Sequence, residues 1–62
     1  MANSTKELRE KADVSQAEAA VLAKVAINSW RVFELAPDAV KPKTRVACER
    51  ALEIIRSKAE AA

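Results

Sequence analysis

The densest group of cationic side chains in the sequence is the segment 41–45, Lys-Pro-Lys-Thr-Arg. The side chains in it that can donate hydrogen bonds to phosphate oxygens are Lys41, Lys43, Thr44 and Arg45. Because proline favours the first turn of a helix, Pro42 places these cations at a helix N-terminus, where they oppose the helix dipole. A phosphate backbone would stabilise them there. The alternative is a solvated charge cluster on an exposed loop.

A second set of side chains with binding chemistry lies in the segment 26–35. Asn28 can pair with adenine in the major groove of DNA, and Arg31 can contact guanine or phosphate. Ile27 and Val32 can touch thymine methyl groups or belong to a protein interface. Asn28 and Arg31 are equally consistent with ordinary solvated residues of a helix surface. The motif that contains them is needed to distinguish DNA contact from solvation.

Residues typical of catalytic and metal sites are scarce. The chain has no histidine and one cysteine, Cys48, which excludes a Cys–His nucleophile, an internal disulfide and a zinc cluster. Asp and Glu residues are scattered without a paired cluster. We therefore expect neither enzymatic activity nor a metal or cofactor. Cys48 shares an apolar stripe with Ala51, Leu52 and Ile55, so it is expected to be a small buried hydrophobic residue.

The length and charge of the chain limit its class. With 62 residues there is room for one small, thinly stabilised domain, which we assign to residues 1–58, with a frayed tail over 59–62. The net charge of +2 is compatible with nucleic-acid binding without being diagnostic. No apolar run approaches the about 20 residues of a membrane span, and the polar first residues lack a secretory apolar region. A cytoplasmic location with a reduced cysteine is expected.

The composition predicts an all-α fold, because the chain lacks glycine and is rich in good helix formers. A cluster of capping residues over 3–5 precedes the first helix, and Ser15 with Glu18 forms a capping box for the second. Pro37 ends the third helix because proline disfavours the helical conformation of its predecessor. The four helices are expected over about residues 6–12, 15–23, 26–35 and 42–58.

Both aromatic side chains of the chain, Trp30 and Phe33, fall on one face of the predicted helix 26–35. At about 100° per residue, this leaves Asn28 and Leu35 on the opposite face. The preceding helix is mostly alanine, which lets another helix approach closely. Two short helices joined by a tight turn, the second anchored by large side chains, are typical of a helix-turn-helix.

The stretch ELREKADVSQAEAAVLAKVAINSWRVFE, residues 7–34, resembles the Cro-like, or XRE-type, helix-turn-helix of phage and bacterial repressors. In that family an "LRE" helix is followed by a second helix of the pattern (S/T)Q-x-E-x-A. The stretch AVKPKTRVACERALEII, residues 39–55, resembles the segment that follows the helix-turn-helix in LacI-type headpieces. The resemblance implies a lambda-repressor-like domain of four helices that binds double-stranded DNA.

The resemblance also implies roles for individual residues. Gln16 matches a phosphate-binding position, Ala20 a helix crossing, and Val25 the residue that closes the turn. Trp30 matches a buried position of the recognition helix. Where the family usually has glycine this chain has Lys24, at a position that tends toward positive φ and is strained by a Cβ atom.

For the third helix, the resemblance favours DNA contact by Asn28 over simple solvation, and contact by Arg31 is favoured because it shares the face of Asn28. With Ile27 and Val32 beside them, the outer face carries fewer hydrogen-bonding side chains than is usual in the family, which predicts sparse base readout. The pair Phe33-Glu34 resembles the aromatic-Glu ending that is frequent in the family. The position of the segment 41–45 just after this helix favours phosphate contact over a solvated cluster.

The expected function is therefore sequence-specific DNA binding by a transcriptional regulator, a repressor of phage, plasmid or bacterial origin. A module this small has a small footprint, so a homodimer on a palindromic operator is expected. The residues expected at its interface are Leu52, Ile54 and Ile55. The alternative is a protein-binding helical module, an antirepressor or adaptor, that uses Ile27, Val32 and Leu35.

Overall fold

The computed structural model describes residues 4–61, which form four α-helices and one 3₁₀ turn. The elements are α1 (Ser4–Lys11), α2 (Gln16–Ala23), α3 (Ile27–Leu35), η1 (Pro37–Ala39) and α4 (Pro42–Ala61). This confirms the all-α prediction. The starts and ends of α1, α2 and α3 lie within two residues of those expected.

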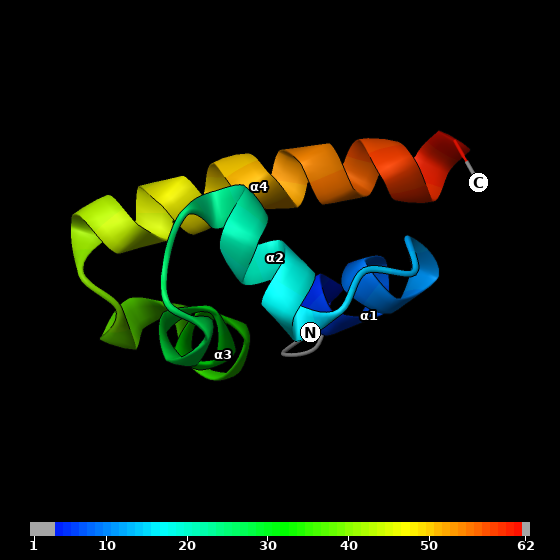
Figure 1. Ribbon diagram of the computed structural model, residues 1–62. Helices are drawn as coiled ribbons and strands as arrows, with labels where there is room; N and C mark the ends of the chain where they lie inside the picture. Colours follow the sequence, from blue (N-terminus) through cyan, green and yellow to red (C-terminus); the bar gives the residue numbers. More distant parts are fainter. Residues whose placement is uncertain (1–3, 62) are drawn as a thin grey trace.

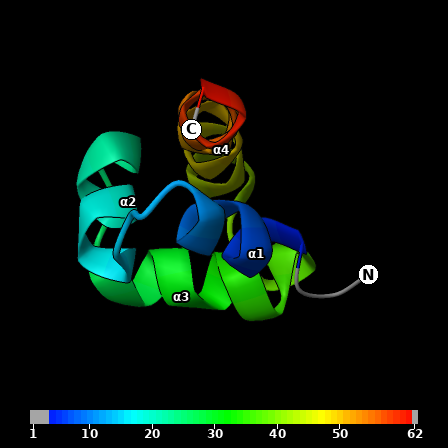
Figure 2. The same ribbon diagram turned by 90° about the vertical axis from the view of Figure 1, so that its right-hand side faces the viewer.

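The longest helix, α4, forms a rod, and the other three helices lie on one side of it (Figure 1). In the turned view α3 runs across the picture while α4 is seen end-on, so the two helices are roughly crosswise (Figure 2). α2 packs against both α3 and α4, and α1 packs against α4. One side of α3 is thereby left facing away from the other helices (Figure 2).

The core lies where α2, α3 and α4 meet. Trp30 and Phe33 enter it from α3 with their ring centroids 5.3 Å apart, which confirms the expected inward face of this helix. The core residues from the other two helices are Ala19, Ala20, Ala23, Cys48, Ala51 and Ile55. Small side chains on α2 let the backbone of α3 approach, so the two aromatic rings supply much of the buried apolar surface.

Local signals place the ends of α2 and α3 as expected. The Oγ of Ser15 accepts a hydrogen bond from the Glu18 amide at 3.1 Å, and the Glu18 carboxylate accepts one from the Ser15 amide at 2.9 Å. This confirms the capping box. α3 ends at Leu35, two residues before Pro37. Of the capping cluster expected before α1, Ser4 and Thr5 instead lie within the helix, and Asn3 lies outside the described residues.

The turn after α2 confirms the expected left-handed backbone at Lys24, whose φ is 58°. A Cβ atom in this conformation destabilises the folded protein by about 1–2 kcal/mol. Glycine removes this strain, but it also makes the unfolded chain more flexible, which offsets part of the gain in stability. Lys24→Gly is therefore expected to raise the free energy of unfolding by about 0.5–1 kcal/mol, measured by urea denaturation. Lys24→Ala, which keeps the Cβ, is the control. An equal gain in both variants would contradict backbone strain as the cause.

The prediction that residues 59–62 fray is wrong for residues 59–61. α4 continues through Ala61, and Ala59 is only 2% exposed. The buried alanine packs the last turns of α4 onto the rest of the chain, which favours helix over a solvated coil. Residue 62 lies outside the described part.

The homodimer surface expected on α4 also needs correction. Ile55 is fully buried because it lies one turn after Ala51 on the inward face of α4, so it cannot contact a second copy. Leu52 is half-buried and Ile54 is 47% exposed. Side chains two residues apart point in directions about 200° apart around the helix axis, so Leu52 and Ile54 lie on different flanks of α4. The three residues do not form one interface.

Candidate nucleic-acid interface

The outward side of α3 presents the four residues that the sequence assigned to base contacts. Asn28 and Arg31 are exposed, and Ile27 and Val32 are 44% and 40% exposed. Leu35, at the far end of the helix, is 83% exposed. The aromatic anchors on the opposite side hold this face outward.

A shallow hollow lies between α3 and the start of α4. Asn28 and Val32 line it from α3, and Lys41 and Thr44 line it from the other side. The remaining lining residues are Ser29, Ala39 and Val40. Two of the expected base-contact residues and two of the expected phosphate-contact residues therefore share one surface.

The side chains of Lys43, Thr44 and Arg45 differ in exposure and in their contacts. Lys43 is exposed, and Thr44 is half-buried. Nη1 of Arg45 donates to Oδ1 of Asp38 at 3.4 Å, and the Asp38 side chain is fully exposed. A solvated pair of this kind contributes little stability, so Arg45 can exchange Asp38 for a phosphate at low cost.

A buried polar cluster joins α1, α2 and α3 behind this surface. The carboxylate of Glu34 accepts hydrogen bonds from Arg9 Nε at 2.6 Å, Trp30 Nε1 at 2.8 Å and Gln16 Nε2 at 3.1 Å. Arg9 Nη1 also donates to the carbonyl oxygen of Val14 at 2.9 Å. Among the described residues no buried side-chain polar atom lacks a hydrogen-bond partner. The cluster therefore holds the three helices in one relative arrangement.

The charge state of Glu34 follows from these contacts. Burial alone would raise its pKa, but the hydrogen bonds from Arg9, Gln16 and Trp30, with the positive charge of Arg9, outweigh burial and hold the pKa below its ordinary value. Glu34 is thus ionised at neutral pH and neutralises the buried Arg9. A buried charge pair of this kind costs far more to break by removing one partner than an exposed pair does.

Gln16, expected at a phosphate, is half-buried and uses one amide N–H on Glu34. A glutamine amide has two N–H donors, so one remains for a phosphate oxygen. The contact with Glu34 fixes the direction of that second donor. The phosphate role of Gln16 therefore remains a prediction with a defined geometry.

The ion pair between Arg9 and Glu34 was not expected from the sequence, in which Glu34 was noted only as part of the aromatic-Glu ending of the family. A signal for Glu34 was present, because it lies four residues after Trp30 and so shares the inward face of α3. A carboxylate on a buried face requires a charged or hydrogen-bonding partner. The partner itself, 25 residues away in the chain, had no comparable signal.

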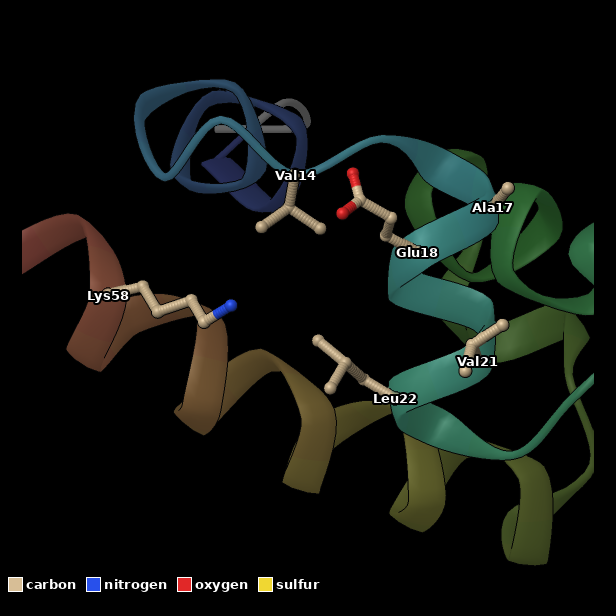
Figure 3. Close-up of a pocket in the computed structure, with 6 residues that line it drawn as sticks. All are labelled: Val14, Ala17, Glu18, Val21, Leu22 and Lys58. Atoms are coloured by element: carbon tan, nitrogen blue, oxygen red, sulfur yellow. The ribbon is translucent and has the colours of Figure 1, made fainter.

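A second hollow, largely apolar, lies between α2 and the C-terminal part of α4. Val14, Leu22 and Lys58 point toward one another across it (Figure 3). Its other lining residues are Ala17, Glu18 and Val21. None of the residues that the sequence assigned to DNA contacts lines this hollow.

Other chemistry is sparse over residues 4–61. Cys48 is free and fully buried, and burial raises the pKa of its thiol, which confirms its interpretation as a small core residue. The described helices include none that is long and apolar enough to cross a membrane. Within the same range, no three His, Cys, Asp or Glu side chains gather as a metal site.

Comparisons of the chain with models of protein families, with curated proteins and with solved structures find no match. The surface of α3 and its neighbours is therefore the basis for a functional inference.

Proposed function

We propose that the protein is a sequence-specific DNA-binding regulator whose helix α3 enters the major groove. The observation that carries this proposal is the hollow in which Asn28 and Val32 of α3 meet Lys41 and Thr44. Contacts to phosphates position a protein on DNA, and contacts to base edges specify the sequence. A surface that combines both kinds of side chain has the chemistry required.

The packing behind α3 supports the same proposal. In this proposal α2 and α3 act as a helix-turn-helix, with residues 24–26 as the turn. The Glu34 cluster ties α3 to Arg9 of α1 and Gln16 of α2, so the recognition helix is held rigidly. Rigid presentation favours specific binding because less conformational entropy is lost on docking. The free N–H of Gln16 serves as a phosphate donor.

One copy of this domain offers a small contact area, so we propose that two copies bind a palindromic operator about one helical turn apart. The protein would repress transcription by occupying the operator, with no catalytic step, metal or cofactor. Leu52 and Ile54 lie on different flanks of α4 and Ile55 is buried, so the two copies do not meet through these three residues together.

Selection of bound sites from random duplex DNA tests the proposal. The expected result is an enriched palindromic motif, two protein chains per duplex, and an affinity that falls steeply as salt concentration rises. A failure to enrich any sequence, with no binding to duplex DNA at low salt, would refute it.

The second candidate, an antirepressor or adaptor that binds protein through Ile27, Val32 and Leu35, is favoured by the exposure of these apolar side chains. It predicts no steep salt dependence and no selected motif.

Two substitutions separate specificity from affinity. Asn28→Ala is expected to cost about 1–3 kcal/mol on the selected operator and little on random DNA, because only a base contact is lost. Lys43→Ala is expected to weaken binding to both DNAs and to lower the salt slope by about one unit, because one phosphate contact is lost. Fluorescence anisotropy titrations at several salt concentrations measure both effects. Lys58→Ala, which is remote from α3, is the control. Equal losses of affinity for both DNAs in Asn28→Ala would show that Asn28 does not read a base.

A further inference from the structure

The N-terminal part of the outward face of α3 is built from two rows of side chains, each with one polar and one aliphatic residue. Leu35 continues the row of Ile27 and Arg31 one turn further on. Asn28 and Val32 are four residues apart and form the row beside the hollow. Ile27 and Arg31, also four apart, form the row on the other side. All four side chains are exposed, so each row offers one hydrogen-bonding group and one aliphatic group to whatever binds α3.

The charges around these rows indicate what covers the aliphatic groups. Lys41 is exposed and lines the hollow beside the first row, Lys43 is exposed two residues further along the chain, and Arg31 belongs to the second row. An aliphatic surface framed by cations is complementary to a polyanion that carries apolar groups between its charges. In the major groove of DNA, the C5-methyl groups of thymine are the apolar groups within reach of side chains.

On the basis of the proposed function, we infer that Ile27 and Val32 read thymine methyl groups and that the operator is specified largely by A·T pairs. Residues of one row lie about 6 Å apart along α3, and successive base pairs rise by about 3.4 Å. The adenine that pairs with Asn28 and the methyl group that contacts Val32 therefore lie about two base pairs apart. Leu35, at the C-terminal end of α3, lies outside this readout, because the N-terminal residues of a recognition helix contact the bases.

Replacing thymine by deoxyuridine tests this inference without altering the protein, because it removes one methyl group and keeps the hydrogen-bonding pattern of the pair. The probe is the duplex obtained by selection, with each thymine replaced in turn. Burial of one methyl group corresponds to about a fourfold change in affinity, so two positions in each half-site should each lose about fourfold. Replacement at other positions should change the affinity less than twofold.

Variants of the protein assign each methyl group to a side chain. Val32→Ala should lose sensitivity to deoxyuridine at one of the two positions and keep it at the other, and Ile27→Ala should show the reverse. Leu35→Ala removes an aliphatic side chain of the same helix that is more exposed than Ile27 or Val32, and should keep both sensitivities. Circular dichroism confirms that each variant remains folded.

The outcomes separate this inference from the function on which it rests. Tight, salt-dependent binding that no deoxyuridine substitution weakens would overturn methyl readout and leave DNA binding intact. Sensitivity that persists unchanged in both Ile27→Ala and Val32→Ala would also overturn it. Absence of binding to any duplex would overturn both proposals and favour a protein partner on α3.

Discussion

Trp30→Ala is expected to abolish the cooperative unfolding transition of the protein. Truncation of a buried tryptophan costs about 3–5 kcal/mol, and a core of this size rarely supplies more than about 3–5 kcal/mol in total. Trp30 is fully buried, packs against Phe33 and donates its indole N–H to Glu34. The variant therefore loses apolar burial and a buried hydrogen bond together. Thermal melts followed by circular dichroism measure the effect.

Two further variants test the cause of this loss. Trp30→Phe keeps an aromatic ring but cannot donate to Glu34, so it should retain a cooperative transition at a lower temperature. Leu35→Ala, on the exposed side of the same helix, should change the free energy of unfolding by less than about 0.5 kcal/mol. If Trp30→Ala instead melted within a few degrees of the unmodified protein, Trp30 would not be the anchor of α3.

Local chemistry made most helix boundaries predictable. The capping box at Ser15 and Glu18 and the proline at Pro37 act over one turn of chain, so neighbouring residues alone determine their effect. The left-handed backbone at Lys24 was predictable from the family resemblance, and the inward face of α3 from the spacing of Trp30 and Phe33. Exposure of the residues expected to contact bases followed from that spacing.

Features that depend on distant parts of the chain were not predictable in the same way. The end of α4 was expected near Lys58, but burial of Ala59 against the rest of the chain extends the helix to Ala61. The burial of Ile55 was predictable, because its spacing from Cys48 and Ala51 places it on the inward stripe of α4. The exposure of Leu52 and Ile54 depends on where α1 and α2 dock on α4, and hydrophobicity alone does not contain that information.

The pairing of Glu34 with Arg9 is the most consequential of these long-range features. Their side chains are only 6% and 10% exposed, so each charge depends on the other. Glu34→Ala is expected to cost about 3–5 kcal/mol at neutral pH, because it leaves the Arg9 guanidinium buried without a counter-charge. Urea denaturation measures the loss. Glu53→Ala removes the partner of an exposed pair with Arg56, 3.9 Å apart, and should cost less than about 0.5 kcal/mol.

Acid provides a second measurement of the same interaction. The pKa of Glu34 is lower in the folded protein than the ordinary value of about 4.3, so its ionised form stabilises the fold. That contribution is complete above the ordinary value and is lost as the pH falls through the lower, folded value. The difference in unfolding free energy between the unmodified protein and Glu34→Gln should therefore be constant near neutral pH and shrink below about pH 4. A difference that stays constant down to pH 2 would show that the carboxylate charge does not hold α1, α2 and α3 together.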